Sequence, residues 1–277
     1  MNKIKTRGQI SIKDVVKIYD PDGAAVMAVD HCSLEIAPGE ICMIVGPSGC
    51  GKTTLLNAIA GFHSIDEGSI HIDGEMLCGP GKLKATPGSD RIVVFQNGAL
   101  FPWKNVIDNV TFGTVMQDKM SVTEAKEKAR SMMADAGLSG TENNFPGELS
   151  SGVRRRVEIV RALMNDPAVL LLDEPYRALD SLTKSVMHES LLDIYYKNKV
   201  TIFFITHDLQ EALFLGHKVA IMTSRPCKPK KVLMVDIPYP RSYSVVTDKR
   251  FRELMEETSE AVHEEAKKSF AAGEREG

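Results

Sequence analysis

Short apolar runs alternate along the chain with stretches whose apolar residues recur at helical spacing. The runs 41–45, 168–172 and 200–205 consist almost entirely of apolar side chains. Uninterrupted runs of this kind are typical of strands buried on both faces of a parallel sheet. Because these strands alternate with helical stretches, the sequence predicts an α/β protein.

Two regions depart from this alternation. Residues 9–19 are rich in β-branched side chains and predict a strand near the N-terminus, and residues 26–34 predict a second one. Farther along, Ser121 and Glu124 have the spacing of a capping box just before apolar residues at helical spacing. We therefore predict a helical subdomain, over residues 97–150, inserted into the α/β core.

Two stretches of the chain are rich in charged residues. The helix expected from residue 150 has four arginines around its apolar stripe, and we interpret them as a solvated helix face rather than a nucleic-acid patch. The tail from residue 248 predicts a charged, exposed helix. The arginines are Arg154, Arg155, Arg156 and Arg161.

The loop after the run 41–45 carries the strongest candidate chemistry. Residues 46–53 have the spacing G-x-x-x-x-G-K-T between a predicted strand and a predicted helix, which is the pattern of a phosphate-binding P-loop. Its glycines let backbone N–H groups approach a phosphate, and the helix N-terminus adds further donors. An ordinary glycine-rich turn is the alternative, and the strand and the helix that flank the loop argue against it. The expected nucleotide contacts are Gly46, Pro47, Ser48, Gly49, Cys50, Gly51, Lys52, Thr53 and Thr54.

Polar residues follow three of the predicted strands. Asp173 and Glu174 end the run 168–172, where α/β sheets bind ligands. The first acid can hold Mg²⁺, and the second can orient or deprotonate an attacking water. Gln96 ends a strand as well. His207 follows the run 200–205, and it is either a structural histidine or a hydrogen-bond partner of the terminal phosphate.

Composition excludes several classes of protein. The 277 residues have 43% hydrophobic and 26% charged side chains and a net charge of −3, so no polyanionic partner is indicated. No apolar run approaches the roughly 18 residues of a membrane span, and the basic residues 1–8 lack the apolar segment of a signal peptide. The five cysteines are scattered, which favours free thiols in a reducing cytoplasm over a zinc site.

At this point the chain resembles the ATP-binding subunits of ABC transporters over roughly residues 8 to 240. Residues 46–53 match the Walker A motif, and residues 170–174 match Walker B with its catalytic glutamate. Residues 149–153 resemble the signature motif, and residues 178–180 match the D-loop. Three single residues match further family positions. They are Gln96 for the Q-loop glutamine, His207 for the switch histidine and Tyr19 for the adenine-stacking aromatic, although a plain surface tyrosine fits position 19 equally well.

The resemblance implies an architecture. We expect a P-loop NTPase core of the ABC ATPase type, with an N-terminal antiparallel β-subdomain and an inserted helical subdomain. The core and its β-subdomain would comprise residues 1–96 and 151–240. Residues 97–150 would form the helical subdomain, and residues 241–277 a charged C-terminal helical extension.

The resemblance also implies a mechanism with ATP and Mg²⁺. A second ATP-binding subunit would bind head-to-tail and would present its signature helix to the terminal phosphate. The family's nucleotide contacts then include Ser150, Gly152 and Asp180, and its Mg²⁺ contacts are Thr53, Gln96 and Asp173. The expected catalytic residues are Glu174, His207, Gln96 and Lys52.

Three positions depart from the family pattern. Ser151 stands where glycine is usual, Val153 where glutamine is usual, and Arg177 where a small residue is common before the D-loop. Ser150 and Gly152 are retained, so phosphate contact is still expected. These departures bear on the turnover rate more than on nucleotide binding.

Within the family, residues 94–106 and 108–110 resemble the nitrate, sulfonate and taurine importer branch. This implies transmembrane permease subunits, a solute-binding protein acting through them, and a peripheral location on the cytoplasmic face of the inner membrane. We also predict that Trp103, on a loop beside Phe101 and Pro102, forms part of the permease-docking groove.

Three alternatives remain open at this point. The first is an ABC ATPase of a lipid-handling or export system. The second is a soluble ABC-type ATPase acting on DNA or ribosomes, which usually carries two cassettes or long insertions. The third is a P-loop kinase, which would leave the signature and D-loop residues unexplained.

Overall fold

The computed structural model describes residues 7–20 and 23–271, which form two compact units. Unit 1 comprises residues 1–88 and 199–277, and unit 2 comprises residues 89–198. Most of the basic N-terminal segment 1–8 lies outside the described residues. Among the helices that the structure describes, none combines the length and the apolar character that a membrane crossing requires.

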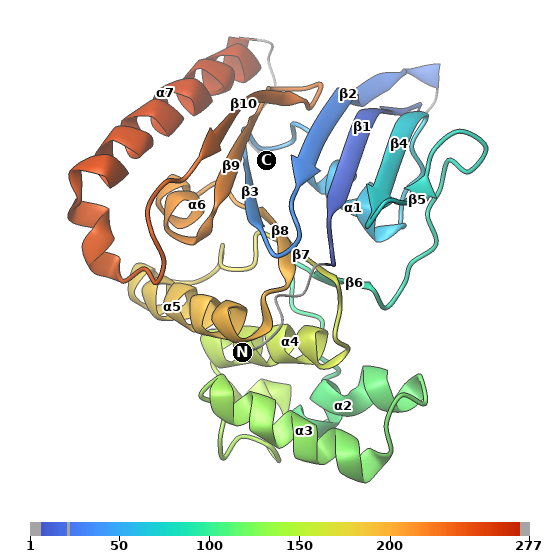
Figure 1. Ribbon diagram of the computed structural model, residues 1–277, viewed down its shortest axis with the longest axis vertical. Coiled ribbons are helices and arrows are strands. Elements are labelled where there is room, and N and C mark those ends of the chain that lie inside the picture. Colours follow the sequence, from blue (N-terminus) through green and yellow to red (C-terminus); the bar gives the residue numbers. More distant parts are fainter. Residues whose placement is uncertain (1–6, 21–22, 272–277) are drawn as a thin grey trace. The chain divides into compact units, whose positions relative to one another are not determined.

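The first sheet of unit 1 is antiparallel and has the strand order β2-β1-β4-β5 (Figure 1). The central strand β1 pairs with two neighbours, since Ile10 lies opposite both Ile36 of β2 and Ile72 of β4. This confirms the expected antiparallel β-subdomain and the two strands predicted near the N-terminus. The bounds are β1 Ile10–Tyr19, β2 Val26–Ile36, β4 Glu67–Ile72 and β5 Glu75–Cys78.

The second set of strands in unit 1 has the order β10-β9-β3-β8. Strand β3 is parallel to both β8 and β9, whereas β10 is antiparallel to β9. Every residue of β3 and β8 is buried, which explains their uninterrupted apolar sequences. The bounds are β3 Ile41–Val45, β8 Thr201–Ile205, β9 Lys218–Met222 and β10 Pro229–Met234.

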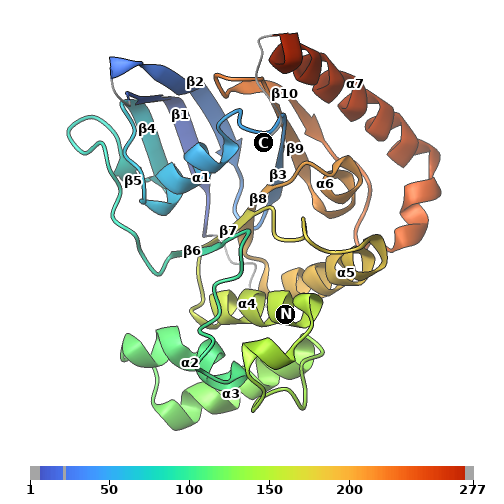
Figure 2. The same ribbon diagram turned by 180° about the vertical axis from the view of Figure 1, so that it is seen from behind.

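The helices of unit 1 pack against these strands. Helix α1 (Lys52–Ala60) contacts β2 and β8 (Figure 2), and α6 (Leu209–Leu215) contacts β3. A 3₁₀ turn, η3 (Tyr243–Thr247), leads into α7 (Lys249–Ala271), which packs against α6 and β9.

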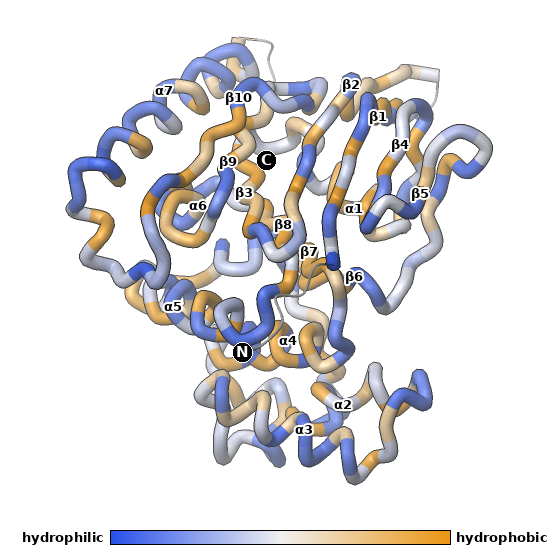
Figure 3. The backbone as a smooth tube through the Cα atoms, viewed as in Figure 1, coloured by the Kyte–Doolittle hydropathy of each residue, from blue (hydrophilic) through white to orange (hydrophobic). Residues whose placement is uncertain are grey.

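Helix α7 corrects the expectation of an exposed C-terminal helix. The helix is present, but its sequence is amphipathic, and hydrophobic positions recur along it (Figure 3). The expected exposure was wrong for one face of the helix. The tail is rich in charged residues, but it also has apolar residues at helical spacing, and these are buried. The buried residues are Phe251, Leu254, Thr258, Ala261, Glu265 and Ser269.

Glu265 is the charged anchor of this buried face. Its carboxylate accepts a hydrogen bond from the backbone N–H of Ser224 at 3.0 Å and pairs with Lys268 at 2.7 Å and Lys230 at 3.1 Å. Its side chain is only 1% exposed. Burial alone would raise the pKa of Glu265, but the hydrogen bonds from Lys268, Ser224 and Lys230 outweigh it and lower the pKa to about 2.

This lowered pKa predicts an acid-dependent part of the stability. The stabilisation by ionised Glu265 is complete above its unfolded-state pKa of 4.5 and is lost as the pH falls from there through about 2. Glu265→Gln should lower the free energy of unfolding at pH 7 by about 3 kcal/mol, and the pH dependence in this window should shrink. Urea unfolding at pH 7 and pH 4 measures both effects.

Glu264→Gln is the matched control, because Glu264 also pairs with Lys230 but its side chain is 59% exposed. An exposed pair contributes little to stability. Equal losses in the two variants would refute the anchoring role of Glu265.

Unit 2 contains one parallel strand pair and four α-helices among its described residues. Strand β6 pairs with β7, and α4 contacts α2, α3, α5 and β6. The predicted capping box is confirmed, because Ser121 accepts from the N–H of Glu124 and Glu124 accepts from the N–H of Ser121. The subdomain boundaries given above stay a prediction. The bounds are β6 Arg91–Val94, α2 Val106–Met116, α3 Val122–Asp135, η2 Pro146–Glu148, α4 Ser151–Met164, β7 Val169–Asp173 and α5 Ser181–Asn198.

Candidate functional site

The P-loop of unit 1 joins the end of β3 to the start of α1. Gly49 and Gly51 have φ angles of 73° and 121°, in the region that favours glycine. A Cβ on Gly51 would lie 2.3 Å from the carbonyl oxygen of Ala28, so a side chain there would clash with β2. Helix α1 begins without a side-chain cap at Gly51, as expected of a helix N-terminus that binds an anion.

Lys52 lies beneath this loop. Its side chain reaches back so that Nζ donates to the carbonyl oxygens of Gly46 at 2.8 Å and Pro47 at 2.7 Å. The residue is only 5% exposed, whereas Ser48 and Thr53 are exposed on the loop surface. The ammonium group is therefore held inside the loop, close to the backbone that would cradle a phosphate.

Cys50 is buried, so it contributes its backbone to the loop surface rather than its thiol. A hydrogen bond with the thiol of Cys227 lowers the pKa of Cys50, and the charge of Lys52 lowers it further against the effect of burial. The same contact and burial raise the pKa of Cys227. This pair joins the phosphate loop to the segment after β9, a contact that the scattered cysteine positions do not reveal.

His207 lies at the same sheet edge as the start of the P-loop. Strands β3 and β8 are parallel neighbours, with Ile44 opposite Ile205, and the N–H of Thr206 donates to the carbonyl of Ile44 at 3.1 Å. His207 is exposed just beyond this contact. The structure therefore places His207 and the P-loop at the ends of two adjacent strands, and contact of His207 with phosphate stays a prediction.

Tyr19 is the last residue of β1, and its side chain is held in place by contacts with neighbouring residues. Its hydroxyl is hydrogen-bonded to Nδ1 of His63 at 2.8 Å, and Nζ of Lys17 lies 5.4 Å from the ring centroid. The ring is half-buried. Base stacking by Tyr19 stays a prediction, and sequence reasoning missed the role of His63.

In unit 2, Gln96, Asp173 and Glu174 come together at the ends of β6 and β7. These strands are parallel, with Val94 opposite Leu172, so the residues that follow both strands lie at one edge. All three side chains belong to half-buried residues. The amide and the two carboxylates therefore supply oxygen donors and a candidate base at the ends of two neighbouring strands.

Ser150 caps the helix that carries the signature residues. Its Oγ accepts from the N–H of Val153 at 3.4 Å, and α4 begins at Ser151. Gly152 is buried, and a Cβ on it would lie 3.0 Å from the methyl group of Thr183. Ser150 itself is exposed at this helix N-terminus.

Asp180 has a local partner in the same unit. Its carboxylate accepts from the N–H of Thr183 at 2.9 Å and from the Thr183 hydroxyl at 2.6 Å. These hydrogen bonds lower the pKa of Asp180. The residue therefore stabilises the first turn of α5, and its contact with nucleotide stays a prediction.

Comparison with known proteins decides the family. A family profile described as "ABC transporter" matches residues 29–177, which is more than half of the chain. The chain belongs to the ABC transporter family. The expected α/β fold of the ABC ATPase type is thereby confirmed, and with it the assignment of the chain as an ATPase of this class.

Individual relatives of this ABC protein extend the match over most of its length. The aliphatic sulfonates import ATP-binding protein SsuB of Bacillus cereus is 39% identical over 233 residues, 84% of this chain and 88% of the relative. The taurine import ATP-binding protein TauB of Rhizobium johnstonii is 42% identical over 248 residues, 87% of this chain and 91% of the relative. A solved dimeric ATP-binding cassette, in a post-hydrolysis state with ADP and phosphate, is 28% identical, with a TM-score of 0.69 over 83% of this chain and 100% of that one.

The arginines of the signature helix of this ABC protein are not a solvated face. Arg155 is only 9% exposed and donates to the carbonyl oxygens of Phe95 and Gln96, each at 2.7 Å. Arg154, Arg156 and Arg161 donate to backbone carbonyls as well. The solvated interpretation was wrong because the acceptors lie outside the helix, where helical periodicity gives no sign of them.

Arg177 is one of the departures from the ABC pattern, and it forms an ion pair with the candidate base, Glu174. Its guanidinium lies 3.2 Å from Oε2 of Glu174, whose side chain is 13% exposed. The pair lies in the turn before α5 and not on a helix, so helical spacing gave no signal for it. Glu174 is thus held by a cation from its own loop.

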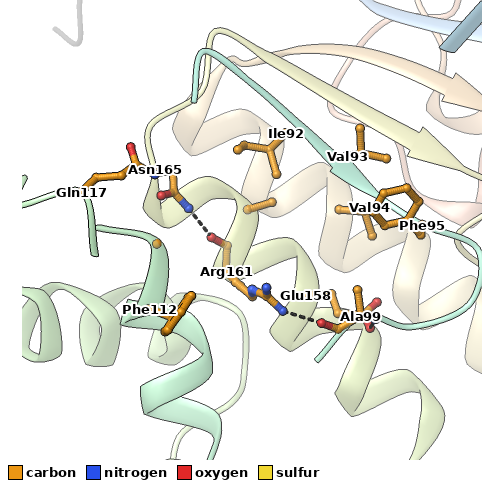
Figure 4. A pocket seen from close by; sticks show the side chains of 12 residues that line it. Ile92, Val93, Val94, Phe95, Ala99, Phe112, Gln117, Glu158, Arg161 and Asn165 are labelled. Carbon is orange, nitrogen blue, oxygen red and sulfur yellow. Dashed lines mark hydrogen bonds between the residues drawn. The ribbon is translucent and has the colours of Figure 1, made fainter. Parts of the chain in front are cut away.

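A cavity of ≈ 240 Å³ lies beside the Q-loop segment of unit 2 (Figure 4). Its lining includes Phe95 and Ala99 after β6, Phe112 of α2, and Glu158 and Arg161 of α4. Apolar walls with a few charged groups are typical of a site that receives another molecule.

Trp103 lies on the loop before α2 and is 71% exposed. Its ring centroid is 5.6 Å from that of Phe101, and Phe101 packs edge-on against Phe112. Trp103 therefore does not belong to the buried core of unit 2. Permease docking by this residue stays a prediction.

Proposed function

We propose that the chain binds and hydrolyses ATP to power an importer of a small anion such as a sulfonate, taurine or nitrate. The ATPase part of this proposal rests on the P-loop, which encloses Lys52, and on His207 at the end of the neighbouring strand. Similarity to import proteins for aliphatic sulfonates and taurine supports the transport part. The subunit would work at the cytoplasmic face of the membrane.

The proposed chemistry gives each of these side chains one role. Lys52 and the loop N–H groups bind the phosphates by charge-assisted hydrogen bonds. Glu174 accepts a proton from the attacking water, and Gln96 orients that water. His207 donates a hydrogen bond to the terminal phosphate, so that it distinguishes ATP from ADP.

The proposed metal ligands fit Mg²⁺. Thr53 supplies a hydroxyl, Gln96 an amide oxygen and Asp173 a carboxylate, and Mg²⁺ prefers such hard oxygen donors with only one or two carboxylates. Bound Mg²⁺ would neutralise charge on the phosphates.

A second subunit would complete each site. Ser150 at the exposed N-terminus of α4 and the backbone at Gly152 would supply donors to the phosphate of the partner. Asp180 would lie at the same interface. Structural similarity to a dimeric ATP-binding cassette supports the pairing of two subunits.

The permease would dock on Trp103. An exposed aromatic ring has the character of an interface anchor, and Trp103 packs against Phe101, which contacts Phe112 of the cavity lining. Trp103→Ala should weaken permease binding by about 2 kcal/mol, roughly 30-fold in affinity, and should leave ATP binding to the isolated subunit unchanged. Reconstitution with permease in vesicles, with transport and ATPase activity as readouts, measures this loss.

Phe270→Ala is the matched control, because Phe270 is an aromatic residue 86% exposed on α7. Since Trp103 is the only tryptophan, its emission should also shift when permease binds. Transport by the Trp103→Ala subunit at the rate of the unmodified subunit would contradict the docking proposal. Failure of the unmodified subunit to support anion-dependent transport would overturn the importer assignment.

A further inference from the structure

Helix α4 holds the main chain on both sides of Gln96. We name residues 95–99 the Q-segment. Arg155 donates one hydrogen bond to the carbonyl of Phe95 and one to the carbonyl of Gln96, both at 2.7 Å. Two parallel bonds from one planar guanidinium fix the direction of both carbonyls.

Glu158 holds the far end of the same segment. Its Oε1 accepts from the N–H of Ala99 at 2.9 Å, while its Oε2 accepts from Arg155 at 2.6 Å. A Cβ on Gly98 would lie 2.6 Å from Oε1 of Glu158, so the segment approaches this carboxylate as closely as glycine allows.

A third residue of α4, Arg161, also binds the Q-segment, and it lines the cavity described above. Arg161 donates to the carbonyl of Ala99 at 2.6 Å (Figure 4). Its guanidinium also lies over the ring of Phe101, 4.5 Å from the ring centroid. The N–H and the C=O of Ala99 are therefore both bound by side chains of one helix. Little freedom remains for the Q-segment to move apart from α4.

Burial makes this arrangement stiff. The side chains of Arg155 and Glu158 are 10% and 7% exposed. Burial raises the pKa of Glu158, and the charge of Arg155 acts in the opposite direction. Displacement of the segment would leave the Arg155–Glu158 pair intact but would remove the backbone partners of both buried charges, which is costly.

We propose that Arg155 and Glu158 form a clamp that makes the Q-segment move as one body with α4, and that Arg155 is thereby a positioning residue for Gln96. The role of Gln96 rests on the proposed function. Since α4 also carries Ser150 at its N-terminus, the clamp couples the position of Gln96 to that of the signature residues in the same subunit.

The test removes both charges together. The double variant Arg155→Met with Glu158→Met deletes the clamp without leaving an unpaired buried charge, so the fold should survive. Amide hydrogen exchange at Ala99 and across the Q-segment should become at least about 10-fold faster. The ATPase kcat should fall about 10-fold while KM for ATP stays within about twofold, because orientation is lost and nucleotide binding is not.

Arg156→Met is the control, because Arg156 lies on the same helix but donates to Ala136 and Gly137. It should leave exchange in the Q-segment unchanged. Unchanged exchange in the double variant, or equal effects in the control, would overturn the clamp.

Repeating the double substitution in a Gln96→Ala protein distinguishes a positioning role from a nonspecific loss of activity. If Arg155 and Glu158 act through Gln96, the double Met substitution should cause no further loss of kcat there. Additive losses would refute the positioning role. A Gln96→Ala enzyme with unimpaired turnover would instead contradict the proposed function of Gln96, while the exchange measurement would still judge the clamp.

Discussion

Glu174→Gln is expected to lower the rate of ATP hydrolysis at least about 100-fold while ATP binding is retained. The amide has the shape of the carboxylate but cannot take a proton from water. Glu174 directly follows β7, and its side chain is held by Arg177 at 3.2 Å, so the substitution changes the chemistry of one ordered group. Phosphate release and fluorescent-nucleotide binding, measured on the same preparation, separate the two effects.

Glu189→Gln is a suitable control, since Glu189 is an exposed carboxylate on α5 of the same unit. It should turn over ATP at the unmodified rate. Normal turnover by the Glu174→Gln protein would show that another group serves as the base.

Lys52→Ala should produce the opposite pattern, with ATP binding weakened by about 3 kcal/mol, on the order of 100-fold in affinity. The substitution removes the ammonium enclosed by the loop and the donors that Gly46 and Pro47 now share. Titration with a fluorescent ATP analogue measures the change in Kd.

Lys84→Ala, at an exposed position of the same unit, tests whether any loss of positive charge has this effect. Equal affinity of the Lys52→Ala protein and the unmodified chain for ATP would exclude the P-loop as the phosphate site. Thermal unfolding of both variants shows whether the loop substitution acts on the fold instead.

Local structure followed the sequence closely where a short pattern determines it. The strand before the P-loop, the start of α1 at Lys52 and the capping box at Ser121 all depend on neighbouring residues. Such features are set within a few positions of the chain, so periodicity and spacing predict them.

Contacts between distant segments could not be predicted in this way. Arg155 binds carbonyls about 60 positions earlier in the chain, Tyr19 binds His63, and Glu265 binds the backbone of Ser224. Polar side chains at such positions have the same local sequence signature whether they face solvent or a backbone carbonyl. The arginines of α4 were misinterpreted for this reason, whereas the buried face of α7 has an apolar stripe that the sequence does contain.

The departures from the ABC signature have a structural context. Val153 donates its N–H to Ser150, and Ser151 begins α4 in an exposed position, so neither replacement disturbs the capped N-terminus. Arg177 gains a contact with Glu174. Nucleotide contact by the signature helix is therefore compatible with all three changes.

Phosphate release by the purified, unmodified chain tests the central claim most directly. With ATP and Mg²⁺ the account predicts release that saturates with ATP, requires Mg²⁺ and exceeds that of the Glu174→Gln protein at least about 100-fold. Release at the level of the Glu174→Gln protein, from a chain shown to be saturated with ATP, would contradict the assignment of this chain as an ATP-hydrolysing subunit.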